Sequence, residues 1–244
     1  MKNIEAFKWT ENVSNGLTLR MPRIIIEEYY WAALKPASKS VYVPLLKFVN
    51  KNGSAFPSIR TLAIVSGVTE KTAGQGIKGL EGLPGFKKIR KVSRRGHIAY
   101  NYFIDEPPPD NKHTIWMSHS YINGGNWSML TPTAQAVLPV LKCFSYWEIE
   151  RYCKEQGMEY SPADLTEIYR CREYDFVDAD ESIICEFAGI TKRSLAAAYE
   201  SLTKHHFIKP VQPYRDKKLW ELEIIPLFYY TRDSLNDRTK ERYG

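Results

Sequence analysis

Cysteine is scarce in this chain, and its spacing does not indicate a metal site. Only four of the 244 residues are cysteines, and none of them belongs to a Cys-x-x-Cys pair. The histidines nearest to them in sequence are adjacent to each other, which is not zinc-finger spacing. We therefore expect no metal ion, and reduced, mostly buried thiols of a reducing compartment. The residues concerned are Cys143, Cys153, Cys171, Cys185, His205 and His206.

Long apolar runs and nucleotide-binding motifs are also missing. No stretch approaches the roughly 20 apolar residues that cross a bilayer, and residues 1–16 lack the apolar centre of a secretory signal. The chain has no P-loop and no His-x-His pair of the kind that relaxases use. The acidic stretch from Asp178 to Glu181 precedes a predicted helix, where capping explains it better than magnesium binding. We expect a cytoplasmic protein that is not an enzyme and needs no cofactor.

The sequence repeats itself along most of its length. When it is shifted by 96 positions, residues 19–48 align with the second copy without a gap, and Trp31 matches Trp127. Further along the offset becomes 122, and Gly67 matches Gly189. Such matches at constant offsets predict two copies of one structural unit that arose by internal duplication.

The two offsets also set the expected domain boundaries. The second offset exceeds the first by 26 residues, which places an insertion in the second copy, and Ser161-Pro162 within it is a typical helix start. Between the copies, the prolines from Pro107 to Pro109 favour an extended linker. The expected parts are residues 1–18 as an N-terminal extension, 19–104 as the first domain, 105–114 as a Pro-rich linker, 115–226 as the second domain with a helical insertion near 151–176, and 227–244 as a C-terminal tail.

Each copy has the pattern of a winged helix. In the first copy, a helix that begins at Pro36 is followed by a short helix with Ser58 as its N-cap. Gly67 ends that helix and Thr69 caps a third one, and two helices joined by a short Gly-containing turn form a helix-turn-helix. The pattern is extended from residue 86 to residue 104, which predicts a β-hairpin wing. We therefore expect an α+β fold, mainly α, made of two tandem winged-helix domains.

Positive charge is concentrated in the first wing. The net charge is +6, and six cations without an acid lie between Lys87 and Arg95. Cations placed on phosphates release condensed counterions, so double-stranded DNA is the favoured partner and a solvated charged face is the alternative. Helix-turn-helix proteins touch base edges with the start of the third helix. The candidate DNA contacts are Lys71, Thr72, Gln75 and Lys78 on the first copy's third helix; Lys87, Lys88, Arg90, Lys91, Arg94 and Arg95 in its wing; and Lys192, Arg193, Ser194, Arg215, Lys217 and Lys218 in the second copy.

Three stretches of the first copy resemble the winged helix of replication initiators from plasmids and phages. They are residues 34–42 (LKPASKSVY), 56–63 (FPSIRTLA) and 66–72 (SGVTEKT), and residues 126–137 are a more divergent relative. The resemblance implies that both modules bind repeated DNA sites at an origin, that host replication proteins are partners and that a homodimer is possible. The linker would let the modules occupy neighbouring major grooves over an asymmetric site of roughly 20 base pairs.

The first copy's third helix departs from this family, in which that helix carries several arginines. Instead it holds Gly74, Gly76 and Gly79, which cost roughly 1 kcal/mol each relative to alanine. Either a close approach to DNA or a weakly selected, marginal helix explains them. Related modules also serve transcriptional repressors. We therefore expect a nucleoid-associated prokaryotic protein that initiates plasmid or mobile-element replication, with a repressor or a protein-interaction adaptor as alternatives.

Overall fold

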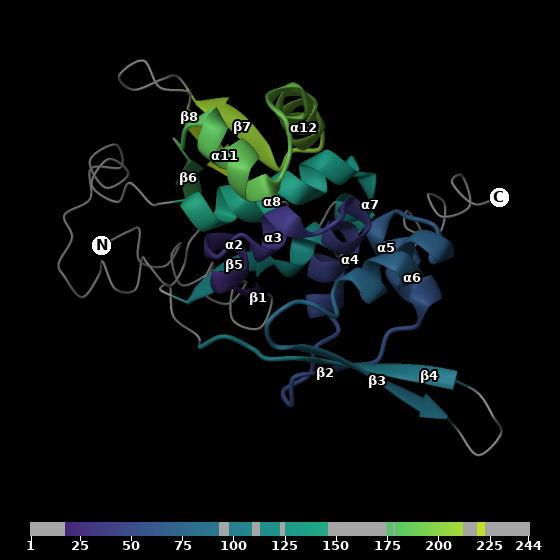
Figure 1. Ribbon diagram of the computed structural model, residues 1–244. Coiled ribbons are helices and arrows are strands. Elements are labelled where there is room, and N and C mark those ends of the chain that lie inside the picture. Colours follow the sequence, from purple (N-terminus) through teal and green to yellow (C-terminus); the bar gives the residue numbers. More distant parts are fainter. Residues whose placement is uncertain are drawn as a thin grey trace, which may run out of the picture.

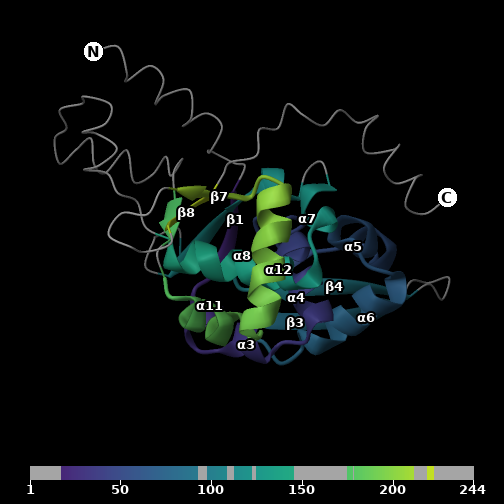
Figure 2. The same ribbon diagram turned by 90° about the horizontal axis from the view of Figure 1, so that it is seen from above.

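The computed structural model describes a mostly helical protein with small antiparallel sheets. The helices lie at the centre, and a three-stranded sheet lies at either end of the molecule (Figure 1). Seen from above, α12 crosses over α8, against which it packs (Figure 2). The structure describes residues 18–92, 98–108, 113–122, 125–145, 175–177, 179–211 and 219–222.

The first half of the chain, as described up to residue 104, begins with a strand and three helices and ends in a hairpin. Its elements are β1 (Thr18–Pro22), α2 (Ile24–Glu27), α3 (Tyr30–Ala33), α4 (Pro36–Leu46), β2 (Ser54–Ala55), α5 (Ile59–Ser66), α6 (Glu70–Gly79), β3 (Phe86–Val92) and β4 (Ile98–Ile104).

The second half, described from residue 113 to residue 222, follows the same order. Its sheet has the strand order β6-β8-β7, which repeats the order β2-β4-β3 of the first half. Its elements are β5 (Thr114–Ser118), the 3₁₀ helix η1 (His119–Tyr121), α7 (Asn126–Met129), α8 (Pro132–Phe144), β6 (Asp175–Val177), α11 (Glu181–Ala188), α12 (Lys192–Lys204), β7 (Ile208–Val211) and β8 (Leu219–Leu222).

The two halves contact each other through matched residues. The indole Nε1 of Trp31 donates a hydrogen bond to Ala136 O (2.8 Å), and that of Trp127 donates one to Ser40 O (2.9 Å). Each donor and each acceptor is 96 positions from its counterpart, so the second bond repeats the first with the halves exchanged. Exchanged contacts of this kind define a two-fold relation, as in a symmetric dimer. We call it the internal two-fold.

The pairing of β1 with β5 obeys the same internal two-fold. The strands are antiparallel, with Leu19 opposite Met117 and Met21 opposite Ile115. The register is centred on Arg20, whose counterpart at the 96-residue offset is Trp116, the residue that faces it. This two-stranded sheet therefore joins the halves symmetrically.

A third pair of matched residues, Lys39 and Gln135, ties each central helix to the other half. The ammonium of Lys39 donates to Ala188 O (2.8 Å), and the amide of Gln135 donates to Ser66 O (3.0 Å). Both carbonyls belong to the last residue of the helix that precedes a helix-turn-helix turn, α11 or α5. These bonds thus hold α11 against α4 and α5 against α8, so each helix-turn-helix is fixed to the central helix of the other half.

The two halves share one hydrophobic core. Trp31 and Trp127 are fully buried, and the same apolar cluster continues from Leu19 to Leu222. α4 and α8 pack against each other and also against helices of their own halves. An apolar helix face is stable only when another element buries it, and here the two halves bury such faces in one core. The structure therefore differs from the expected pair of modules held apart by an extended linker.

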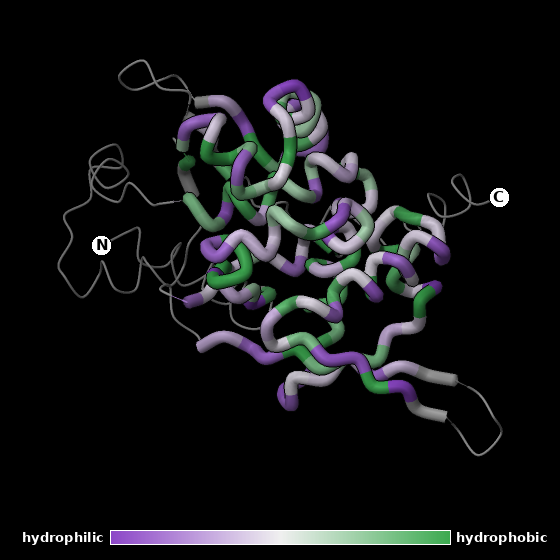
Figure 3. The backbone as a smooth tube through the Cα atoms, in the orientation of Figure 1, coloured by the Kyte–Doolittle hydropathy of each residue, from purple (hydrophilic) through white to green (hydrophobic). Residues whose placement is uncertain are grey.

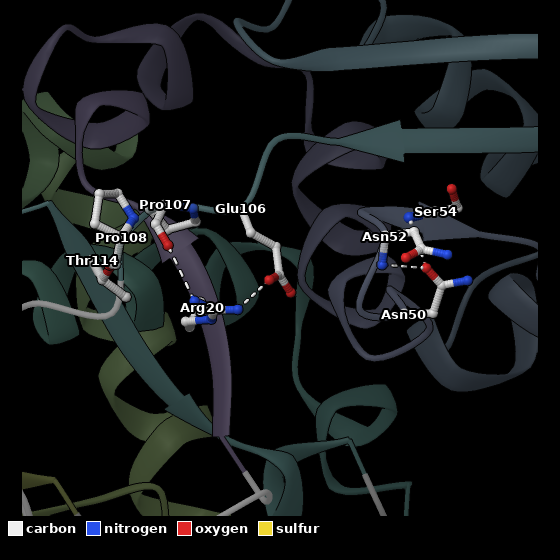
Figure 4. A network of polar contacts seen from close by, with 8 residues as sticks. All are labelled: Arg20, Asn50, Asn52, Ser54, Glu106, Pro107, Pro108 and Thr114. Atoms are coloured by element: carbon white, nitrogen blue, oxygen red, sulfur yellow. Dashed lines mark hydrogen bonds and ion pairs between the residues drawn. The ribbon is translucent and has the colours of Figure 1, made fainter.

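The proline-rich connection is fixed to the first strand. Arg20 donates a hydrogen bond to Pro107 O (3.3 Å) and forms an ion pair with Glu106 (Figure 4). The hydroxyl of Thr114 donates to Pro108 O. These bonds hold the described part of the connection against β1 and the start of β5.

Part of the predicted organisation lies outside the described residues. The extension up to residue 17, the C-terminal tail and most of the predicted helical insertion near 151–176 fall there. The last two positions of that insertion, 175 and 176, belong to strand β6.

Candidate nucleic-acid interface

Helices α5 and α6 are joined by the tight turn that the sequence predicts. Gly67 ends α5 with a left-handed backbone (φ 70°), a conformation that favours glycine. The side chains of Ser58 and Thr69 each accept a hydrogen bond from the backbone N–H three residues later, at 3.0 and 3.2 Å. Both predicted N-caps and the predicted glycine stop are confirmed, so the start of α6 is fixed by local bonds.

The outer face of α6 presents a row of polar side chains. Lys71, Gln75 and Lys78 are exposed, and their spacing places them on one face of the helix. Thr72 is half-buried, and its hydroxyl lies 2.9 Å from that of Thr69. Of the four contacts predicted on this helix, three are open to a ligand and Thr72 also serves the cap.

Two of the three glycines of α6 serve helix packing. A Cβ on Gly76 would lie 2.5 Å from Ala37 O, and one on Gly79 would lie 2.3 Å from Ser38 Oγ, both on α4. The hydroxyl of Ser38 also donates to Gly76 O (3.0 Å). At Gly76 the missing Cβ lets α6 lie directly against the backbone of α4, whereas at Gly79 the neighbouring atom is the end of the Ser38 side chain. At Gly74, by contrast, an added Cβ would have no atom within 4 Å.

The charges of the first wing are not equally available. Lys87 and Arg90 are exposed on β3. The ammonium of Lys88 lies 3.2 Å from Glu81 Oε1 and 4.6 Å from the centre of the Tyr100 ring. The basic run itself contains no acid, but folding brings Glu81 to it from the turn after α6. A phosphate would therefore have to compete with Glu81 for Lys88, whereas Lys87 and Arg90 face solvent.

The tube coloured by hydropathy shows hydrophilic residues along much of this hairpin and hydrophobic ones gathered between the helices (Figure 3). Lys91 belongs to β3, but its side chain is outside the described residues. The predicted contacts that lie wholly outside the described residues are Arg94, Arg95, Arg215, Lys217 and Lys218.

The second half has a helix-turn-helix of the same geometry. Gly189 ends α11 with φ 62°, and the Thr191 side chain accepts from Ser194 N–H (3.3 Å) at the start of α12. Lys192 and Arg193 are exposed, as their predicted role requires. Ser194 is half-buried, with its hydroxyl 3.0 Å from that of Thr191, so like Thr72 it takes part in the cap.

The exposed faces of α6 and α12 differ in chemistry at matched positions. At the 122-residue offset, Gln75 corresponds to Ala197 and Lys78 to Glu200, and all four side chains are exposed. An amide that can bond two atoms of adenine is thus replaced by a methyl group, and a cation is replaced by an anion. At the start of the helices the difference is reversed, because the exposed Glu70 corresponds to the exposed Lys192. The α6 face therefore offers polar and basic groups along its length, whereas the cations of the α12 face lie at its start and at Lys204 near its end.

Two contributors to this architecture were missed in the sequence analysis. Lys39 is buried between the halves, and burial lowers its pKa to about 8. Arg60 is an exposed cation in the first turn of α5, beside the Ser58 cap. The repeat offset already pairs Lys39 with Gln135, and Arg60 lies within the FPSIRTLA stretch, so both signals were present in the sequence.

Comparison with known families found one similarity, and it falls on the first of these units. Residues 32–83 match the helix-turn-helix domain. The matched range contains α4, α5 and α6 and ends just before the wing. A helix-turn-helix domain suggests sequence-specific DNA binding, with double-stranded DNA as the partner. No curated protein and no solved structure matches the chain.

The described part of the chain has neither a membrane-spanning helix nor a cluster of metal-ligating side chains. None of its helices has the length and apolar character needed to cross a membrane. Nor do three or more metal-ligating side chains come together there. Asp180 occupies the N-cap position of α11, although its side chain makes no capping hydrogen bond, and Asp178 lies outside the described residues.

Proposed function

We propose that this protein is a plasmid or mobile-element replication initiator that binds double-stranded DNA at origin repeats. The observation that carries the proposal is the internal two-fold, which relates two helix-turn-helix units within one body. In Figure 1, α12 lies over α8 at the top of the molecule and α6 lies at its right beside α5, with β1 and β5 to the left of both. In this proposal α6 and α12, which both have exposed polar side chains, contact one duplex.

The rigid union of the halves favours binding by both. A shared core fixes α12 relative to α6 before DNA arrives, so no freedom between the halves is lost on binding. The exposed cations of α6 and β3 supply the contacts to phosphates, which dominate affinity and make it depend on salt. In this proposal the two halves arose by duplication of one winged helix and together cover roughly 20 base pairs, about two turns.

The resemblance of residues 34–72 to plasmid and phage initiators supports the replication role over a purely regulatory one. Under this proposal host replication proteins bind the assembled complex, and no step is catalysed by the chain itself. A homodimer is compatible with the same role.

Two measurements test the proposal. A mobility-shift titration over a range of salt concentrations should show binding to duplex DNA whose affinity falls steeply with salt. A plasmid that carries the gene and its flanking DNA, but no other origin, should replicate in a suitable host. Replication that survives Lys71→Ala with Lys78→Ala would contradict the proposal, as would repression of a flanking promoter without any replication.

A further inference from the structure

The internal two-fold has a consequence for the DNA that this chain can recognise. Trp31, Trp127 and the β1–β5 register show that the halves are related by rotation, with contacts exchanged between them. α6 and α12 are matched elements, so the same rotation carries one onto the other and reverses the component of its direction that is perpendicular to the axis. A translation along the chain, as between beads on a string, would instead repeat their direction.

B-DNA has two-fold axes perpendicular to its length, and proteins with two-fold symmetry align that axis with one of them. Their half-sites are then inverted repeats, as in the operators of dimeric helix-turn-helix proteins. Here the two-fold lies within a single chain. We propose that one chain of this protein reads two inverted half-sites, and that it reads the half-site under α6 more stringently than the one under α12. The inference rests on the proposed DNA-binding function.

Unequal reading follows from the side chains at matched positions. Gln75 offers an amide that can bond the N6 and N7 atoms of adenine, and its counterpart Ala197 offers no polar atom. Lys78 attracts phosphates, and its counterpart Glu200 repels them. Arg193 retains the capacity for one bidentate contact to guanine. Lys192, whose counterpart is Glu70, adds a second cation beside Arg193. The α12 half-site should therefore be constrained at the base pairs that the start of the helix reaches and tolerant along the rest.

Selection from a random duplex library with the full chain tests the arrangement. The expected result is a site with two inverted arms about one helical turn apart, of which one is strongly constrained and the other weakly. Arms in direct repeat, or arms equally constrained, would overturn this inference and leave DNA binding intact. A library that yields no bound sequence would overturn the proposed function, and this inference with it.

Substitutions that exchange the residues of α6 and α12 at matched positions then show which helix reads which arm. Gln75→Ala should reduce discrimination in the strong arm by about 10-fold, while the weak arm stays as it was. Ala197→Gln with Glu200→Lys should create new base preference in the weak arm. All four positions are exposed, so the fold should persist, and circular dichroism checks that it does. Arg20→Gln removes a cation on β1, which belongs to neither helix-turn-helix, and should alter neither arm. Exchanges that change both arms alike would overturn the assignment.

Discussion

The described parts of the two halves have matching elements in the same order, with η1 in the place of α2, yet they differ where a nucleic acid would meet them. Inside, Trp31 and Trp127 make the same bond across the interface, at 2.8 and 2.9 Å. Outside, α6 shows Gln75 and Lys78, and α12 shows an alanine and a glutamate at the matched positions. The comparison indicates that the interface constrains both halves equally, whereas the surface of each half has its own chemistry.

The largest loss of stability is expected when a side chain is added to Gly67 or Gly189, the glycines of the two helix-turn-helix turns, because each lies against the backbone of the other half. A Cβ on Gly67 would lie 2.2 Å from Ser128 O, and one on Gly189 would lie 2.3 Å from Ala32 O. Both glycines also have a positive φ, so Gly67→Ala and Gly189→Ala should each lower the free energy of unfolding by about 3 kcal/mol. Urea unfolding measures both. Gly74→Ala is the control, because open space surrounds that position and the helix should gain stability.

A smaller effect is expected from the exchanged tryptophan bonds. Trp31→Phe and Trp127→Phe each remove a buried N–H donor and leave a small void, which should cost about 2 kcal/mol in either half. Equal losses by urea unfolding would support the internal two-fold. Losses that differ by more than about 1 kcal/mol would show that one half depends on the interface more than the other.

The interface also contains asymmetric pairs of matched residues, among them the charged Lys39 and its neutral counterpart Gln135. Burial lowers the pKa of Lys39 from 10.5 to about 8, so between these values the unfolded chain binds a proton that the folded chain has lost. Stability therefore gains from Lys39 as pH rises above 8, by on the order of 1 kcal/mol. Lys39→Gln copies the matched residue and should abolish that gain.

The difference between wild type and Lys39→Gln isolates this contribution. The raised pKa values of Cys143 and of buried tyrosines such as Tyr102 act on both proteins alike. Urea unfolding at several pH values from 7 to 9.5 provides the measurement, and Lys35→Gln, an exposed lysine nearby, serves as the control. Parallel stability profiles for wild type and Lys39→Gln would contradict the assignment.

The smallest effect concerns the wing of the first half. Lys87→Ala removes one phosphate contact and should lower the salt slope of DNA binding by roughly 0.9. Because Lys88 already pairs with Glu81, Lys88→Ala should lower that slope by less. Glu81→Gln should release Lys88 and strengthen binding by under about 1 kcal/mol. Mobility-shift titrations at several salt concentrations distinguish these variants. Equal slopes for both lysine variants would show that the ion pair opens on DNA.

Local features of the fold could be predicted from the sequence because their causes are local. Ser58, Thr69 and Thr191 accept bonds from backbone groups a few residues away, and Gly67 stops its helix by its own backbone preference. The repeat offsets likewise require nothing beyond the sequence. These signals were sufficient to place both helix-turn-helix units.

The relation between the halves could not be predicted in the same way. The spacing of apolar residues predicts that Trp31 is buried, but it does not indicate whether Trp31 packs inside its own half or against the other half. The proline run suggested separation, whereas Arg20 fixes that segment to β1. The pairing of Lys88 with Glu81 and the packing role of Gly76 also depend on tertiary contacts.

The most direct test of joint binding by α6 and α12 is a hydroxyl-radical footprint of the full chain on a selected site. The account predicts two protected patches on one face of the duplex, about 10 base pairs apart. Gln75→Ala should weaken protection mainly in one patch, and Arg193→Ala mainly in the other. A single patch that Arg193→Ala leaves unchanged would contradict the account, because the second helix-turn-helix would then not contact DNA.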